Sequence, residues 1–277
     1  MNKLYMYEYR IGTESGEALA KSLGIKRIKH AGSIFVGHPD TVIINWGSSS
    51  LPDNIAPSRV LNKPETVATA INKKKFFRKV GPFCRVVPYT TDQEVAKEWL
   101  SEGYKVVCRK QVKGYEGQGI EVICPQEGQG SPPTGILGTL ASLVAKKFSA
   151  AVPPSEAVLP TCPLYTQFIR AKAEYRVHVV GDKVIAVHKK VGDGDPTIKN
   201  TANNWKFKRV QIYNQDVVEQ ALLAVKAVEL DFAAVDVLWD GDKAWVLEAN
   251  TAPGIYDMPW TLEQWTVAIR ALALPPT

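Results

Sequence analysis

The sequence of 277 residues predicts an α+β protein whose first lobe is α/β. Residues 41–45 form a β-branched apolar run, typical of a buried strand. Residues 14–23 repeat apolar side chains with a helical period. Residues 233–254 are two apolar stretches around an Asp-Gly turn, which indicates a hairpin near the C-terminus. Helices and strands therefore alternate early in the chain, and hairpins dominate later.

The other helices and strands are predicted from residues that typically begin or end such elements. A helix is expected over 64–79, with Asn62 as its candidate N-cap and Pro64 in its first turn. Thr91 or Asp92 begins a second helix that ends near residue 100. Further strands are expected over 85–88, 104–110 and 120–124, and further helices over 135–149, 216–230 and 262–272.

Composition places the chain among ordinary globular proteins, with 45% apolar and 22% charged residues. No apolar run approaches the length of a membrane span, and the N-terminus is not a signal sequence, so we expect a cytoplasmic protein without a membrane partner. The four cysteines are scattered and indicate neither a zinc site nor a disulfide framework. The oligomeric state is not predicted.

The formal charge of +6 and the pI near 9.0 are compatible with a nucleic-acid partner. Much of the excess is local, however, in residues 73–79 and in Lys189-Lys190. A polyanionic small ligand such as ATP explains these clusters equally well.

Two acids and an amide in the C-terminal hairpin indicate a metal site. Asp236 lies within the first strand, Glu248 near the end of the second, and Asn250 two residues later. Buried carboxylates are costly unless they are paired or bind a metal, and these hard oxygen donors suit Mg²⁺. The structural alternative is that Asp236 and Glu248 cap loop backbones.

The metal site makes a geometric demand. Side chains alternate between the faces of a strand, so Glu248 is expected to share a face with Val246 and Asn250. A two-residue turn at Asp240-Gly241 would separate the two acids. We therefore predict a three-residue loop, or a bulge with the same effect.

A glycine-rich loop over 113–119 connects two predicted strands. Glycine lets backbone N–H groups approach an anion, so Gly114, Gly117 and Gly119 predict a flap over phosphates. Arg109, at the end of the preceding strand, can bind the same phosphates. A plain hairpin turn and an exposed arginine are the alternatives.

The segment 174–190 predicts a charged hairpin face. Glu174, Arg176 and His178 alternate with apolar residues, and a two-residue turn at 181–182 would pair Glu174 with Lys189. Lys189 then joins the polar face, while Lys190 and His188 point away. Such a face could bind ribose and phosphates, with His178 contacting the substrate, or could simply be solvated.

These pieces, in this order, resemble the ATP-grasp superfamily of carboxylate–amine ligases. The likeness is strongest at Asp236 and the Glu-x-Asn-Thr-x-Pro-Gly pattern that begins at Glu248. It extends to small ATP-grasp proteins of phages and bacteria and, more loosely, to ribosomal-protein glutamate ligases and D-alanine ligases. It implies two α+β lobes gripping ATP after a small α/β domain, with domains at 1–62, 63–163 and 164–277.

The resemblance also implies roles for individual residues. Lys73, for which Lys74 or Lys75 could substitute, and Arg109 would reach the nucleotide phosphates. The flap would be Gly114, Gly117 and Gly119, and the adenine hinge Gln167, Phe168 and Ile169. Glu174 would bind ribose, Arg176 and Lys189 would be catalytic at the γ-phosphate and acyl phosphate, and Asn200 and Asn204 would lie near the phosphates. Asp236, Glu248 and Asn250 would bind Mg²⁺, or Mn²⁺ in its place.

In this family ATP phosphorylates a carboxylate, and an amine attacks the acyl phosphate to form an amide, releasing ADP and phosphate. The substrates would be small-molecule or peptide carboxylates and amines, with a nucleic acid as a less favoured acceptor. If the gene is a phage gene, the location is the host cytoplasm. The alternatives are an ATP-grasp-type kinase and a non-catalytic nucleotide- or nucleic-acid-binding protein. Substrate contacts are expected from Ser48–Ser50, Arg176, His178, Asn204 and Tyr256.

Overall fold

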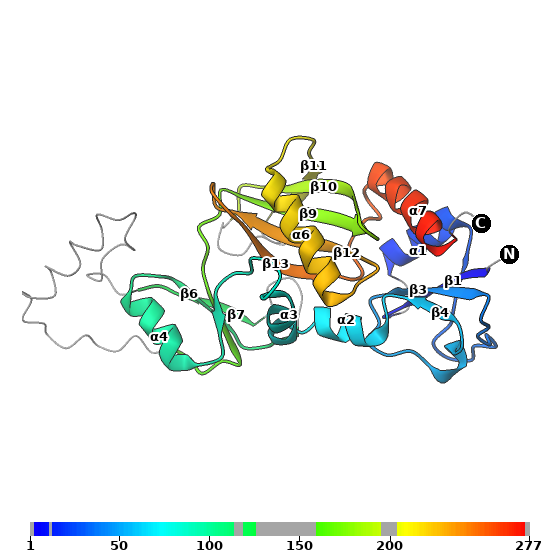
Figure 1. Ribbon diagram of the computed structural model, residues 1–277, viewed down its shortest axis with the longest axis horizontal. Coiled ribbons are helices and arrows are strands. Elements are labelled where there is room, and N and C mark those ends of the chain that lie inside the picture. Colours follow the sequence, from blue (N-terminus) through cyan, green and yellow to red (C-terminus); the bar gives the residue numbers. More distant parts are fainter. Residues whose placement is uncertain (1–2, 11–12, 114–118, 126–158, 195–203, 275–277) are drawn as a thin grey trace, which may run out of the picture. The chain divides into compact units, whose positions relative to one another are not determined.

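A computed structural model describes residues 3–10, 13–113, 119–125, 159–194 and 204–274 (Figure 1). The chain forms two compact units, one of Met1–Val86 with Arg170–Thr277 and one of Val87–Ile169. Within the described residues, no helix is long and apolar enough to cross a membrane.

The first sheet of the larger unit has the strand order β2-β1-β3-β4, and all of its pairings are parallel. Its strands are β1 (Lys3–Glu8), β2 (Lys26–Arg27), β3 (Thr41–Trp46) and β4 (Arg59–Leu61). Helix α1 (Glu14–Leu23) ends at Gly24, which adopts a positive φ of 69°. The predicted helix over 14–23 and the predicted buried strand are confirmed.

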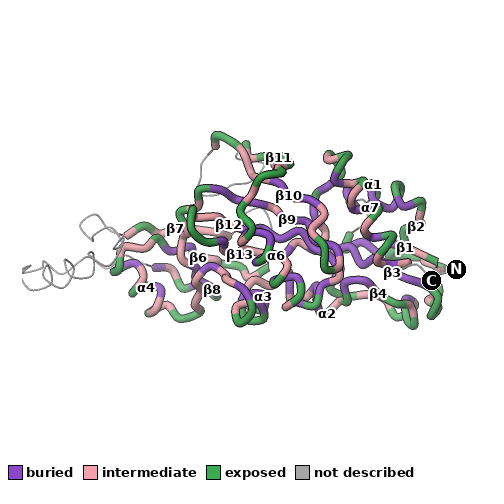
Figure 2. Tube along the Cα trace, turned by 45° about the horizontal axis from the view of Figure 1, so that its top comes forward, coloured by how far each residue is buried: buried purple, intermediate pink, exposed green. Residues whose placement is uncertain are grey.

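The second sheet of this unit is antiparallel, with the order β11-β10-β9-β12-β13. Its strands are β9 (Ala173–Val180), β10 (Lys183–Val191), β11 (Lys206–Arg209), β12 (Phe232–Trp239) and β13 (Ala244–Asn250). Figure 1 shows α6 (Gln215–Val228) lying across this sheet, and α7 (Pro259–Ala273) packs against β9, β10 and α1. Figure 2 shows buried residues along the central strands β9 and β12.

The two sheets of the larger unit share one hydrophobic core. Trp46 from the first sheet stacks on Phe232 from the second, with ring centroids 5.8 Å apart. Trp265 of α7 meets both rings edge-on and is fully buried. Because each ring buries a large apolar surface, the N-terminal α/β region is joined firmly to the C-terminal sheet.

The helix predicted over 64–79 is divided into α2 (Pro64–Ala70) and α3 (Lys73–Val80). The side chain of Asn72 accepts a hydrogen bond from the Lys75 amide at 3.1 Å, which starts a new helix and breaks the continuous one. Both helices pack against α6, so the region that begins the predicted lobe 63–163 lies in the larger unit.

Asn62 does not cap α2, contrary to the prediction. It adopts a positive φ of 59°, and its side-chain oxygen accepts from the backbone amides of Asp231 and Phe232. The Asp231 carboxylate in turn accepts from the Asn62 amide at 2.6 Å. The residue therefore connects the first sheet to the start of β12.

The smaller unit contains a sheet of order β5-β8-β6-β7. Its elements are β5 (Tyr89–Thr90), α4 (Gln93–Ser101), β6 (Val106–Arg109), β7 (Ile120–Ile123) and β8 (Leu164–Gln167). Asp92 caps α4, as one of the two predicted starts. The strand predicted over 85–88 is replaced by β5 and by an isolated bridge from Val86 to Val246. The helix predicted over 135–149 lies outside the described residues.

Candidate functional site

The site is built on the hairpin of β12 and β13. Trp239 pairs with Ala244, so the loop has four residues, and the predicted three-residue loop is wrong. The register then shifts at Leu247, which leaves Val246 opposite Val237 and Glu248 opposite Asp236. A bulge was the predicted alternative to the three-residue loop, and it is confirmed. One extra residue in a strand turns every later side chain to the opposite face of the sheet.

The bulge brings the predicted metal ligands together. Asp236 and Glu248 are direct cross-strand partners and therefore share a face of the sheet. Asn250 donates from its side chain to Glu248 at 3.1 Å. Val246 faces the opposite side, so the expectation that Glu248 and Val246 share a face is wrong.

Arg176 binds Asp236 through two parallel hydrogen bonds. The Nε and Nη2 atoms donate to the two carboxylate oxygens at 2.7 and 2.8 Å, from the neighbouring strand β9. Burial disfavours the charged guanidinium, yet the attraction and hydrogen bonds of Asp236 raise the pKa of Arg176 above its ordinary value. The Arg176 guanidinium is therefore charged at neutral pH.

Lys73, at the start of α3, forms an ion pair with Glu248. Burial alone would raise the pKa of Glu248, but the Lys73 ammonium, and beyond it Arg176 and Asn250, hold that pKa well below its usual range. The lysine predicted to reach phosphates and the acid predicted to bind a metal therefore lie in one cluster.

The β9–β10 hairpin differs from its predicted register. The two-residue turn over 181–182 is confirmed, because Lys183 pairs with Val180. A bulge at Ile185 then shifts the pairing by one residue, so that Lys189 opposes Tyr175. The predicted pairing of Glu174 with Lys189 is wrong, and Lys189 points to the other face.

Lys190, and not Lys189 as predicted, lies beside Glu174 on the polar face. Its ammonium forms an ion pair with Glu174 at 2.7 Å, and both side chains are nearly buried. Phe207 of β11 lies beside this pair, with its ring centroid 4.2 Å from the Arg176 guanidinium and 5.2 Å from the Lys190 ammonium. Phe207 was not predicted as a site residue, although an aromatic residue inside the basic run 206–209 is a visible signal in the sequence.

His178 is a core residue, so its predicted contact with substrate is wrong. Its side chain is fully buried, and Nδ1 accepts from the Trp265 indole at 3.0 Å. His188, which was predicted to be structural and to point away, lies on the same face opposite Arg176 and beside Thr261 at 3.1 Å. Burial lowers the pKa of both histidines, that of His188 to about 4. Helix α7 therefore covers this end of the polar face.

The depressed histidine pKa makes stability depend on pH. Unfolded His188 binds a proton near pH 6.5, whereas the folded state binds it only near pH 4. The stabilisation is complete above pH 6.5 and is lost as pH falls towards 4, by up to about 3 kcal/mol. Urea unfolding at pH 7, 6, 5 and 4 should show this fall, and His188→Gln should make it shallower, because only the buried His178 then still contributes to it. An unchanged slope in that variant would contradict the assignment.

The smaller unit carries the predicted flap base and hinge. Arg109 ends β6 opposite Ile120, and Gly119 has a positive φ of 68° and accepts from the Lys110 amide at 2.8 Å. The amides of Gln167 and Phe168 donate to the carbonyls of Pro88 and Lys105, so both belong to the sheet framework. Ile169 ends this unit. The roles of Arg109, Gly119 and the hinge residues remain predictions.

Other predicted positions are less informative. Gly114, Gly117 and Asn200 lie outside the described residues. Asn204 has a positive φ of 61° and donates from its side chain to Asp193. Ser48 is buried and its hydroxyl donates to the Ser50 carbonyl, so this loop is closed on itself.

The donor set at the hairpin fits a divalent ion. A carboxylate offers more lone pairs than the hydrogen bonds made here, and Asp236, Glu248 and Asn250 supply oxygens from one face. Lys73 and Arg176 neutralise the two acids in the form that the structure shows. In the described part of the chain, no three His, Cys, Asp or Glu residues form a metal-binding group, so the fit depends on the Asn250 amide.

Comparison with known proteins agrees with this fold. Residues 139–267 match the RimK-like ATP-grasp domain. A probable alpha-L-glutamate ligase of Haemophilus influenzae strain PittEE is 32% identical over 117 residues, 41% of this chain and 39% of that protein. The chain thus spans about two fifths of the length of that relative.

Two solved structures resemble nearly the whole chain. The ATP-grasp ligase PsnB, complexed with minimal precursor, Mg and ADP, has a TM-score of 0.63 at 16% identity, covering 98% of this chain and 97% of that one. D-alanine–D-alanine ligase of Bacillus anthracis has a TM-score of 0.61 at 10% identity, with 98% and 97% covered. The chain therefore has the ATP-grasp fold, and residues 139–267 match the RimK-like ATP-grasp domain, in agreement with the resemblance inferred from the motifs.

Proposed function

We propose that this protein is an ADP-forming carboxylate–amine ligase that uses ATP and Mg²⁺ and forms an amide through an acyl phosphate. The observation that carries the proposal is the charged cluster on one sheet face. There Asp236 opposes Glu248, and Lys73 and Arg176 bind these two acids. The names of the similar proteins, which include glutamate and D-alanine ligases, support the same reaction.

Phosphoryl transfer requires the protein mainly to align the reacting groups and to neutralise the charge of the phosphates. Mg²⁺, when held by Asp236, Glu248 and Asn250, would supply positive charge beside the phosphates. Arg176 uses Nε and Nη2 on Asp236, so its Nη1 group would face a phosphate oxygen. Lys73 is placed to exchange its contact with Glu248 for a contact with phosphate.

For the carboxylate and amine substrates, only the chemical class is proposed. Another structure of PsnB is complexed with a precursor peptide, which favours a peptide substrate, and the basic charge of this chain favours an anionic one. Small-molecule carboxylates and amines fit the same reaction. We propose a cytoplasmic location, where ATP is available.

Mass spectrometry tests the reaction directly. The protein is incubated with Mg-ATP and pooled amino acids or peptides, and we expect ADP together with a new amide mass. Hydroxylamine should trap the acyl phosphate as a hydroxamate. A phosphorylated product without an amide or hydroxamate would indicate a kinase, and no ADP in any mixture would exclude the ligase.

The register of β10 makes a prediction that separates two adjacent lysines. Lys190→Met should lower kcat/KM for ATP by about 30-fold, because it removes a charge beside Glu174 and Arg176. Lys189→Met is the matched control and should change kcat/KM less than threefold, since Lys189 faces the other side. The reverse result, measured as ADP release, would restore the register predicted from alternation.

A further inference from the structure

Part of the edge of β10 lies open beside a hollow. Strand β11 pairs with residues 188–191 of β10, and the Val210 amide donates to the Val187 carbonyl at 3.0 Å. After Val210 the segment that follows β11 no longer pairs with β10. Among the described residues, no strand pairs with residues 183–186 on the side away from β9.

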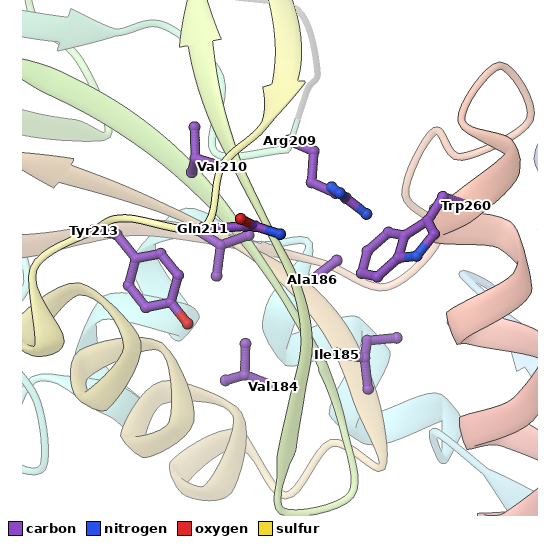
Figure 3. A pocket seen from close by; sticks show the side chains of 9 residues that line it. Val184, Ile185, Ala186, Arg209, Val210, Gln211, Tyr213 and Trp260 are labelled. Carbon is purple, nitrogen blue, oxygen red and sulfur yellow. The ribbon is translucent and has the colours of Figure 1, made fainter.

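The hollow has a volume of about 240 Å³. Its walls include Val184, Ile185, Val210, Tyr213 and Trp260. Figure 3 shows Tyr213, just before α6, and Trp260, in the first turn of α7, on either side of β10. The space has room for one side chain, five of its nine lining residues are aliphatic, and Trp260 is 42% exposed at its rim.

Positive charge lies next to the hollow. Three of the four residues of β11 are basic, Lys206, Lys208 and Arg209. The Arg209 guanidinium lies over the Trp260 ring, 4.2 Å from its centroid, so a cation lies at the wall of the hollow. A ligand that fits both features has an apolar group flanked by negative charges.

An exposed strand edge is often protected by a bulge or a lysine, and β10 has both, at Ile185 and Lys183. Protection alone does not account for the hollow or for the Trp260 ring that remains half-exposed there. An edge with a side-chain pocket beside it is the arrangement by which sheets bind extended peptides.

We propose that this edge and hollow bind an extended acidic peptide, which places one apolar side chain in the hollow and carboxylates against Arg209 and Lys208. The proposal rests on the proposed function in taking this peptide as part of the substrate. Ala186 and Lys190 are four residues apart on β10, roughly 13 Å along the strand. Strand β11 occupies the edge beyond residue 187, so a peptide bound at residues 183–186 would leave the edge there and reach the charged cluster with a few further residues.

A peptide fits better than a nucleic acid. The hollow is lined mainly by aliphatic side chains, and the open edge offers backbone groups that match another extended backbone. Single-stranded nucleic acid would instead need several aromatic platforms along a basic groove. An oligonucleotide of equal charge serves as the rival probe.

Fluorescence anisotropy at low salt tests the site with a labelled peptide, acetyl-Glu-Glu-Glu-Leu-Glu-Glu-amide. We expect binding that weakens about tenfold in Arg209→Glu and about fivefold when the central leucine of the probe is serine. Lys21→Glu makes the same charge change on exposed α1 and should alter binding less than twofold. Equal losses in the two protein variants, or no effect of the serine, would overturn the proposal.

Three further measurements complete the test. Trp260→Ser, checked for folding by circular dichroism, should weaken peptide binding, and unchanged binding would count against the hollow. Tighter binding of an oligonucleotide of equal charge would assign the surface to nucleic acid and overturn the peptide proposal. Glu248→Gln should keep peptide affinity while losing turnover. Peptide binding without any ligase activity would refute the proposed function alone, whereas activity on small substrates without peptide binding would refute the docking site alone.

Discussion

Replacing Glu248 by glutamine is expected to lower ATP-dependent ADP release by on the order of a thousandfold. The change replaces the Glu248 carboxylate, which lies opposite Asp236, by a neutral amide and so removes one negative charge from the proposed metal site. It also leaves the Lys73 ammonium beside a neutral amide, so the charge balance of the cluster is lost. The measurement is coupled detection of ADP at saturating Mg-ATP, with folding checked by circular dichroism.

The control for this variant is Glu229→Gln. Glu229 also forms an ion pair with a lysine of α3, Lys79, but the pair is largely exposed. Because exposed ion pairs contribute little, ADP release should stay within twofold. If Glu248→Gln retained wild-type turnover, Glu248 would be no metal ligand and the proposed site would be wrong.

Replacing Asp236 by asparagine is expected to reduce the free energy of unfolding by about 3 kcal/mol. Asp236 and Arg176 are joined by two hydrogen bonds, and both side chains are largely buried. The variant leaves the guanidinium charged and buried without its counter-ion. Urea unfolding monitored by tryptophan fluorescence measures the difference.

Removing both charges gives the matched comparison. The double variant Arg176→Met with Asp236→Leu leaves no uncompensated charge, so it should unfold with a smaller loss than Asp236→Asn alone. Asp182→Asn, in the exposed β9–β10 turn, should change stability by less than about 0.5 kcal/mol. If the double variant were less stable than Asp236→Asn, the explanation by an uncompensated buried charge would be wrong. The ion pair would then itself stabilise the fold.

Local sequence patterns predicted the elements well where the signal was local. The helix over 14–23, the cap at Asp92 and the turn over 181–182 follow from nearby residues alone, and all three are confirmed. The division between α2 and α3 was also local, since Asn72 is a good N-cap, but a continuous helix was predicted across it. Asn62 was misassigned because its partners are about 170 residues away.

Bulges decided which side chains share a face. Alternation predicts faces only while the period of two holds, and one extra residue reverses every later side chain. The bulge at Leu247 brought Glu248 to Asp236, as the metal site required. The bulge at Ile185 turned Lys189 away and brought Lys190 to Glu174. Neither Leu247 nor Ile185 carries a turn residue's signature, so their positions could not be predicted.

The sequence by itself determined the ATP-grasp architecture and the membership of the acidic cluster, because Asp236, Glu248 and Asn250 lie in one short hairpin. Only the tertiary structure decided what covers and what pairs with that cluster. Helix α7 buries His178 under Trp265, α3 brings Lys73 to Glu248, and β11 sets Phe207 beside Arg176. These contacts join residues far apart in the chain, and packing between whole elements selects them, which no local periodicity encodes.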